Sequence, residues 1–98
     1  MSLRDEYFAR MVSKFKSWDA EFSMLTERSE QLSADTRAPY DGQLEKLRAN
    51  RDAAYKKLQE IRTTGESAWR GLQAGLDAAW GPLKITLDRL STELKKMA

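Results

Sequence analysis

The stretch that decides the fold is residues 8–25, FARMVSKFKSWDAEFSML, in which large apolar residues recur at alternating intervals of three and four. The residues with this spacing are Phe8, Met11, Phe15, Trp18, Phe22 and Leu25. Leu32 continues the spacing after a polar interruption at Ser29. Because this spacing places the whole set on one face of a helix, it is typical of a coiled-coil seam. The seam predicts a first helix over residues 2–36.

The composition of the whole chain also favours helix. Of the 98 residues, 57 are Ala, Leu, Met, Glu, Gln, Lys or Arg, and only nine are Val, Ile or Thr. The first group has high helix propensity, and the second is typical of strands. Ser2, three residues before Asp5, is a start signal for the first helix.

The apolar spacing is disturbed at residues 36–42, TRAPYDG, and then resumes. The resumed seam consists of Leu44, Leu47, Ala54, Leu58 and Ile61, with Arg51 at one of its positions. Proline cannot donate a backbone hydrogen bond, and it disfavours helical angles in the residue before it. Two interpretations stay open: a break at Pro39 followed by a second helix over 39–62, or one continuous, kinked helix through Pro39.

A third helix is predicted over residues 65–97, after a turn at Thr63–Glu66 in which Thr63 serves as the helix cap. Related segments recur there every 11 residues: GESAWRGL, LDAAWGPL and LDRLSTEL. Their apolar residues are Trp69, Leu72, Leu76, Trp80, Leu83, Leu87, Leu90 and Leu94. At 100° per residue this set occupies one face about 80° wide. Pro82 lies near the opposite face and is expected to curve the helix without ending it.

These segments predict a single all-α domain, either an antiparallel helical hairpin or a three-helix coiled-coil bundle, and an oligomeric protein. A continuous helix through Pro39 would be about 90 Å long, whereas the third helix would cover only about 48 Å of it. The uncovered seam would then require a second chain. The residues expected in the core or interface are Phe8, Met11, Phe15, Trp18, Phe22, Leu25, Leu44, Leu47, Leu58, Ile61, Trp69, Leu72, Leu76, Trp80, Leu83 and Leu87.

The composition disfavours several classes of function. The chain has no Cys and no His, so it lacks thiolate nucleophiles, the usual general base near neutral pH and the commonest metal ligand. We therefore expect a protein that is not an enzyme, with no catalytic, cofactor-binding or metal-binding residues. The net charge of +2 from 17 basic and 15 acidic residues indicates a mixed surface and no nucleic-acid partner. The absence of an apolar signal segment and of a long apolar run favours the cytoplasm.

The sequence resembles two groups of helical proteins. Residues 43–80, the element Trp18-Asp19-Ala20-Glu21 and the recurring Ala-Trp-x-x-Leu resemble small bacterial coiled-coil proteins to which no function is assigned. That resemblance implies a helical fold and no particular chemistry. The 11-residue units resemble the repeats of exchangeable apolipoproteins, which implies reversible binding to lipid surfaces.

Two functions are therefore expected. The first is a non-enzymatic coiled-coil scaffold or interaction module that self-associates or binds another helical protein. The alternative is reversible binding to a lipid or membrane surface through the third helix, with Trp69 and Trp80 in the interface. The aromatic seam from Phe8 to Phe22 is interpreted as packing and not as a cofactor site.

Overall fold

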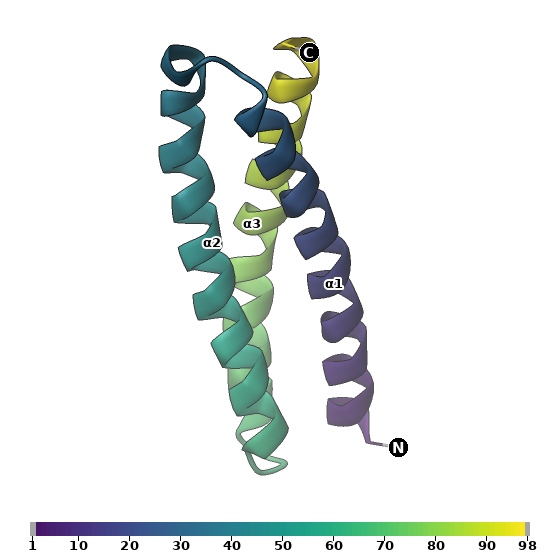
Figure 1. Cartoon of the computed structure of the whole chain (residues 1–98). Coiled ribbons are helices and arrows are strands. Elements are labelled where there is room, and N and C mark those ends of the chain that lie inside the picture. The colour runs from purple at the N-terminus through teal and green to yellow at the C-terminus, as the bar shows by residue number, and fades with distance from the viewer. Residues whose placement is uncertain (1, 98) are drawn as a thin grey trace.

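The computed structural model describes residues 2–97, which form three α-helices and no strand. In chain order these are α1 (Leu3–Glu30), α2 (Ala34–Thr63) and α3 (Trp69–Met97). Neighbouring helices are antiparallel, so the chain runs up, down and up (Figure 1). Each helix contacts both of the others. The predicted all-α class is confirmed, and of the two predicted arrangements the three-helix bundle is the one that forms.

The first helix begins where the sequence predicts and ends earlier. The backbone N–H of Asp5 donates a hydrogen bond to the hydroxyl oxygen of Ser2 (3.1 Å), which confirms the predicted cap. At the other end, α1 stops at Glu30 and not near residue 36. The N–H groups of the next two residues, Gln31 and Leu32, bond back to carbonyls only three residues away and close a tight turn.

The second helix begins at Ala34, so the junction predicted at residue 39 is wrong. Ser33 caps the helix, because its hydroxyl oxygen accepts a hydrogen bond from the N–H of Thr36 (3.3 Å). Pro39 is the sixth residue of α2, where its missing N–H leaves the carbonyl of Asp35 without its usual helical partner. Because Asp35 is exposed in the first turn, water can bond to that carbonyl. Pro39 therefore neither separates the first two helices nor kinks one continuous helix.

The third helix begins at Trp69, four residues after the predicted start. Residues 65–68 form a turn in which the carbonyl of Gly65 accepts hydrogen bonds from the N–H groups of Ala68 (3.1 Å) and Trp69 (3.3 Å). Thr63 is the last residue of α2 and not the cap of α3. Pro82 lies inside α3 and does not end it, as predicted.

The three helices match in length, which decides how the apolar seams are covered. They contain 28, 30 and 29 residues, and each is therefore about 42–45 Å long. The bundle measures 50 × 20 × 16 Å. Because every helix has two partners along its length, the apolar seams are buried within one chain.

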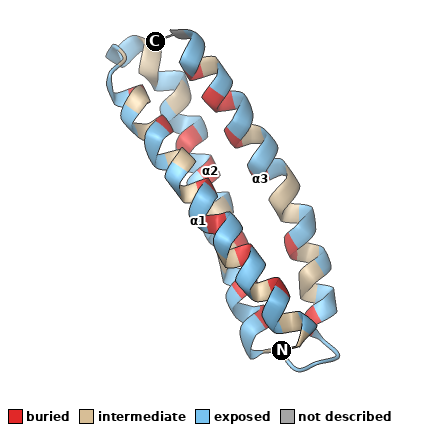
Figure 2. Ribbon diagram, turned by 90° about the vertical axis from the view of Figure 1, so that its right-hand side faces the viewer, coloured by how far each residue is buried: buried red, intermediate tan, exposed pale blue. Residues whose placement is uncertain are grey.

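The core consists of the predicted apolar stripes with few changes (Figure 2). Twelve of the sixteen predicted core residues are buried: Met11, Phe15, Trp18, Leu25, Leu44, Leu47, Leu58, Ile61, Trp69, Leu76, Leu83 and Leu87. The other four, Phe8, Phe22, Leu72 and Trp80, are half-buried and pack against the core. The core also contains Tyr7, Ala54, Leu90 and Leu94. Of these, Tyr7 belongs to neither a predicted seam nor a predicted stripe.

Candidate interaction surface

The predicted aromatic seam forms the centre of the bundle. The ring of Phe15 on α1 meets the rings of Tyr55 on α2 and Trp80 on α3 edge to face, with centroids 5.2 and 5.1 Å apart. Trp18 stacks on Phe22 at 5.1 Å, and its indole N–H donates a hydrogen bond to the carbonyl of Leu83 (3.1 Å). Since each buried ring packs against half-buried rings around it, the seam functions as packing, as the sequence indicates.

Arg51 interrupts the α2 seam because it bridges two helices. Its guanidinium group donates two hydrogen bonds to the carboxylate of Asp19 on α1, at 2.9 and 2.7 Å. The same group lies over the rings of Tyr55 (4.6 Å) and Phe15 (5.5 Å). The hydrogen bonds to Asp19 raise the pKa of Arg51 above its ordinary value. The sequence places Arg51 at a seam position, and in the structure this residue lies at the edge of the core, where it is half-buried.

Tyr7 is a buried polar residue with a partner on another helix. Its hydroxyl group donates a hydrogen bond to the carboxylate of Asp77 on α3 (2.6 Å), and its ring lies 6.1 Å from that of Trp69. Burial, followed by the hydrogen bond and charge of Asp77, raises the pKa of Tyr7 well above its ordinary value. The neutral phenol is therefore the form that the folded protein stabilises.

This raised pKa predicts a loss of stability in alkali. The folded state disfavours ionised Tyr7, so its contribution is complete below about pH 10, the ordinary tyrosine pKa, and is lost as pH rises above it. We expect the stability difference between the natural protein and Tyr7→Phe to narrow as pH rises above about 10, by at most about 1.4 kcal/mol per pH unit. Chemical unfolding from about pH 8 to about pH 12 measures this difference. A constant difference over that range would contradict the assignment.

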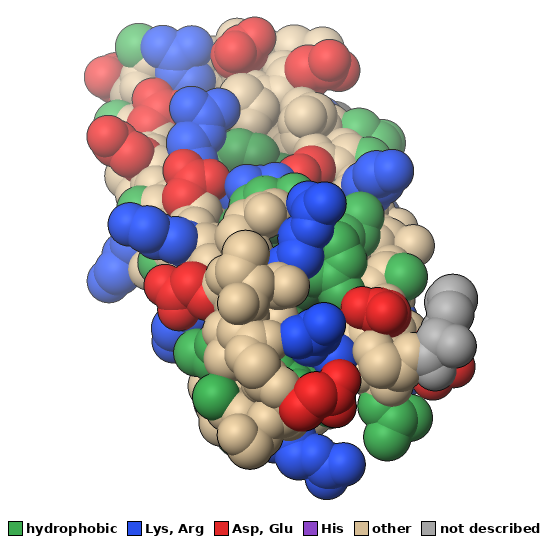
Figure 3. Space-filling model, turned by 90° about the horizontal axis from the view of Figure 1, so that it is seen from below, with side chains coloured by type: hydrophobic (Ala, Val, Ile, Leu, Met, Phe, Trp, Pro, Cys, Tyr) green, Lys and Arg blue, Asp and Glu red, His purple; other side chains and the backbone are tan. Residues whose placement is uncertain are grey.

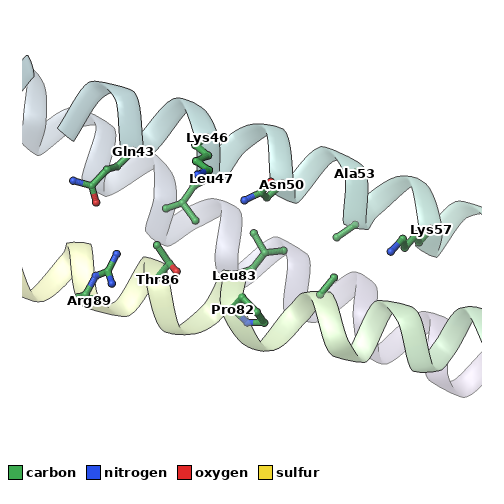
Figure 4. Close-up of a pocket in the computed structure, with 12 residues that line it drawn as sticks. Gln43, Lys46, Leu47, Asn50, Ala53, Lys57, Pro82, Leu83, Thr86 and Arg89 are labelled. Carbon is green, nitrogen blue, oxygen red and sulfur yellow. The ribbon is translucent and has the colours of Figure 1, made fainter. Parts of the chain in front are cut away.

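A groove of about 510 Å³ runs between α2 and α3 on the side of the bundle away from α1 (Figure 4). Its lining on α2 consists of Gln43, Lys46, Leu47, Asn50, Ala53, Ala54 and Lys57. Successive members are one or three residues apart in the sequence, so they share one face of the helix. The lining on α3 consists of Ala79, Pro82, Leu83, Thr86 and Arg89. Small side chains on both helices keep the groove open.

The groove has an apolar floor and a basic rim. The buried residues Leu47, Ala54 and Leu83 form the floor. Every charged residue in the lining is basic: Lys46, Lys57 and Arg89. The amino group of Lys57 extends toward α3, because it lies 3.9 Å from the position that a Cβ atom would occupy at Gly75.

A second groove, between α1 and α2, differs in its charges. This cavity of about 410 Å³ is lined by Glu30, Arg37, Asp41, Glu45 and Arg48, together with Phe22, Thr26, Ser29 and Leu44. Arg37 and Asp41 form an ion pair at 3.3 Å. Its basic and acidic residues therefore offset one another, whereas the rim of the α2–α3 groove carries a single sign of charge.

A third groove, of about 440 Å³, lies between α1 and α3, and its charged residues Arg10, Lys14 and Lys84 are also all basic. It differs from the α2–α3 groove because Lys84 forms ion pairs with Glu21 and Asp88.

No group of three or more potential metal-ligating side chains occurs within residues 2–97. None of the three described helices is long and apolar enough to cross a membrane. Viewed from one end of the bundle, basic and acidic side chains are interspersed (Figure 3).

Comparison with known proteins gives no family for the chain. A scan against protein-family models, a search of the curated proteins and a search of the solved structures found no match. The resemblances to bacterial coiled-coil proteins and to apolipoprotein repeats therefore stay predictions from the sequence.

Proposed function

We propose that the protein is a non-enzymatic interaction module that binds a helix of a partner in the groove between α2 and α3. The observation that carries this proposal is the groove itself, with its apolar floor and a length from Gln43 to Lys57 that corresponds to about 21 Å of helix. An amphipathic helix of about four turns would fill that length. The complex would resemble a four-helix bundle in which the partner supplies the fourth helix.

Self-association remains part of the proposed function, but it would use a different surface of the protein from the one that the sequence predicts. The sequence predicts contact between chains through the apolar seams, but those seams pack within one chain. A second copy of the protein would therefore have to use this groove or another exposed face.

Lipid binding through α3 stays an alternative proposal that no feature of the bundle favours. Most of the apolar stripe of α3 is buried against the other two helices, with Trp69 only 5% exposed and Leu72 and Trp80 half-buried. To place that stripe in a lipid surface, α3 would have to leave the bundle.

The groove can be tested with a displayed library of peptides that share an amphipathic pattern of apolar residues and vary at every other position. We expect selected peptides to bind the natural protein and to lose binding to Ala53→Trp, because the indole would occupy the groove. Ala20→Trp on α1 is the matched control, since Ala20 is also exposed and lies outside the groove. If no selected peptide distinguishes these two variants, the groove is not the binding site.

A further inference from the structure

We infer that the partner of the α2–α3 groove is an acidic amphipathic helix, with carboxylates on both sides of an apolar stripe. This inference rests on the proposed function and adds the chemistry of the partner. Its basis is the rim of the groove, where three basic side chains surround an apolar floor that has no acidic residue.

The rim cations are not neutralised by acidic residues of the bundle. Lys46, Lys57 and Arg89 form no ion pair with any residue in the described part of the chain. By contrast, Arg51 pairs with Asp19 across helices at 2.7 Å. Carboxylates from a bound helix would supply the charge that the rim lacks, with the largest effect on partner choice and association rate.

The positions of the cations predict the spacing of the carboxylates. Lys46 and Lys57 are eleven residues apart on α2, which corresponds to about 16 Å along the helix axis. Lys46 and Arg89 lie toward one end of the groove and Lys57 toward the other (Figure 4). A partner helix would therefore carry acidic residues about eleven positions apart, or three helical turns, with its apolar residues between them.

Charge also favours a different protein over a second copy as the occupant. The helix α2 has seven basic and five acidic residues, and α3 has five basic and three acidic residues. The helix α1 is nearly balanced, with five basic and six acidic residues. Since all three helices use their apolar stripes within the bundle, no helix of a second copy offers a free apolar stripe with acidic flanks.

The peptide library described above tests this chemistry. Among the peptides that lose binding to Ala53→Trp, we expect Asp and Glu to be enriched at flanking positions about eleven residues apart. Binding of these peptides should weaken as salt concentration rises, because the rim is exposed and its charges are screened. We call peptides that lose binding to Ala53→Trp groove-dependent. If these peptides showed no enrichment of Asp and Glu, the inference would be wrong and the proposed function would be unaffected.

A charge-reversal variant tests whether the basic rim of the groove causes the preference for acidic peptides. We expect Lys46→Glu combined with Arg89→Glu to weaken the selected peptides about tenfold or more, since attraction becomes repulsion at two positions. The control combines Lys14→Glu with Lys16→Glu on exposed positions of α1, outside the groove, and changes the net charge equally. Circular dichroism would check that both variants stay helical. Equal weakening by the two variants would overturn the inference.

Light scattering at the same protein concentrations identifies a competing occupant. We expect a monomer whose mass is unchanged by the reversal at Lys46 and Arg89. A dimer that this reversal abolishes would mean that a second copy occupies the groove, and the inference would be wrong. If the natural protein bound anionic vesicles and Ala53→Trp did not, that result would overturn the inference and identify a lipid surface as the occupant of the groove.

Discussion

Replacing Trp18 by alanine is expected to lower the free energy of unfolding by about 3–5 kcal/mol. The side chain is only 2% exposed and stacks on Phe22. Its truncation would leave a cavity at the centre of the bundle and remove the hydrogen bond to the carbonyl of Leu83. Small domains are typically stable by about 5–15 kcal/mol, so this one change would remove a large part of the total. Urea or guanidinium unfolding followed by circular dichroism measures the loss.

Two variants control for this effect. Met24→Ala on the same helix should change the stability little, because Met24 is 56% exposed and lies off the seam. Trp18→Phe should be intermediate, since it keeps much of the apolar volume and removes the indole hydrogen bond. If Met24→Ala cost as much as Trp18→Ala, the assignment of the buried face of α1 would be wrong.

The parts of the fold that the sequence predicts correctly are those that many residues determine together. The seam of α1 has six apolar positions from Phe8 to Leu25, so an error at one position would not change the assignment of the helix or its buried face. The stripe of α3 is equally redundant, and its Leu and Trp residues are buried or half-buried as predicted. Long periodic patterns therefore predict the three helices and most of the core.

The apolar spacing does not locate the junction between α1 and α2, because a single residue determines it. Ser33 caps α2 through one hydrogen bond, whereas Pro39, the conspicuous residue nearby, lies inside the helix. A proline this close to the start of a helix leaves only one exposed carbonyl without a partner. The capping signal of Ser33, three residues before Thr36, could have located the junction.

Tyr7 and the groove depend on residues that are far apart in the chain. The apolar spacing predicts Phe8 in the core and does not include its neighbour Tyr7, whose burial requires Asp77 on another helix to accept its hydroxyl hydrogen bond. The groove brings together Ala53 and Ala79, two residues that a sequence pattern treats as neutral. Neither feature has a local signal, because each exists only after the helices have packed.

Pro82 is the residue whose removal is expected to stabilise the protein. It lies in the interior of α3, where its ring crowds the carbonyl of Ala78 and its missing N–H leaves that carbonyl without a helical hydrogen bond. The side chain of Pro82 is exposed and lines the groove. Its replacement should therefore restore helical bonding and remove little packing from the core.

We expect Pro82→Ala to raise the free energy of unfolding by about 1–3 kcal/mol, after an offset of about 0.4–1 kcal/mol for the larger entropy of the unfolded chain. For a domain of this size, each kcal/mol would raise the thermal midpoint by about 4–8 °C. Pro39→Ala should give a smaller gain, because the affected carbonyl lies in the exposed first turn of α2. Calorimetry of the three proteins measures both changes. A lower midpoint for Pro82→Ala would mean that the ring supports the bundle by packing. A higher midpoint together with weaker binding of groove-dependent peptides would instead show that Pro82 destabilises α3 but gives the groove wall the shape that the peptides bind.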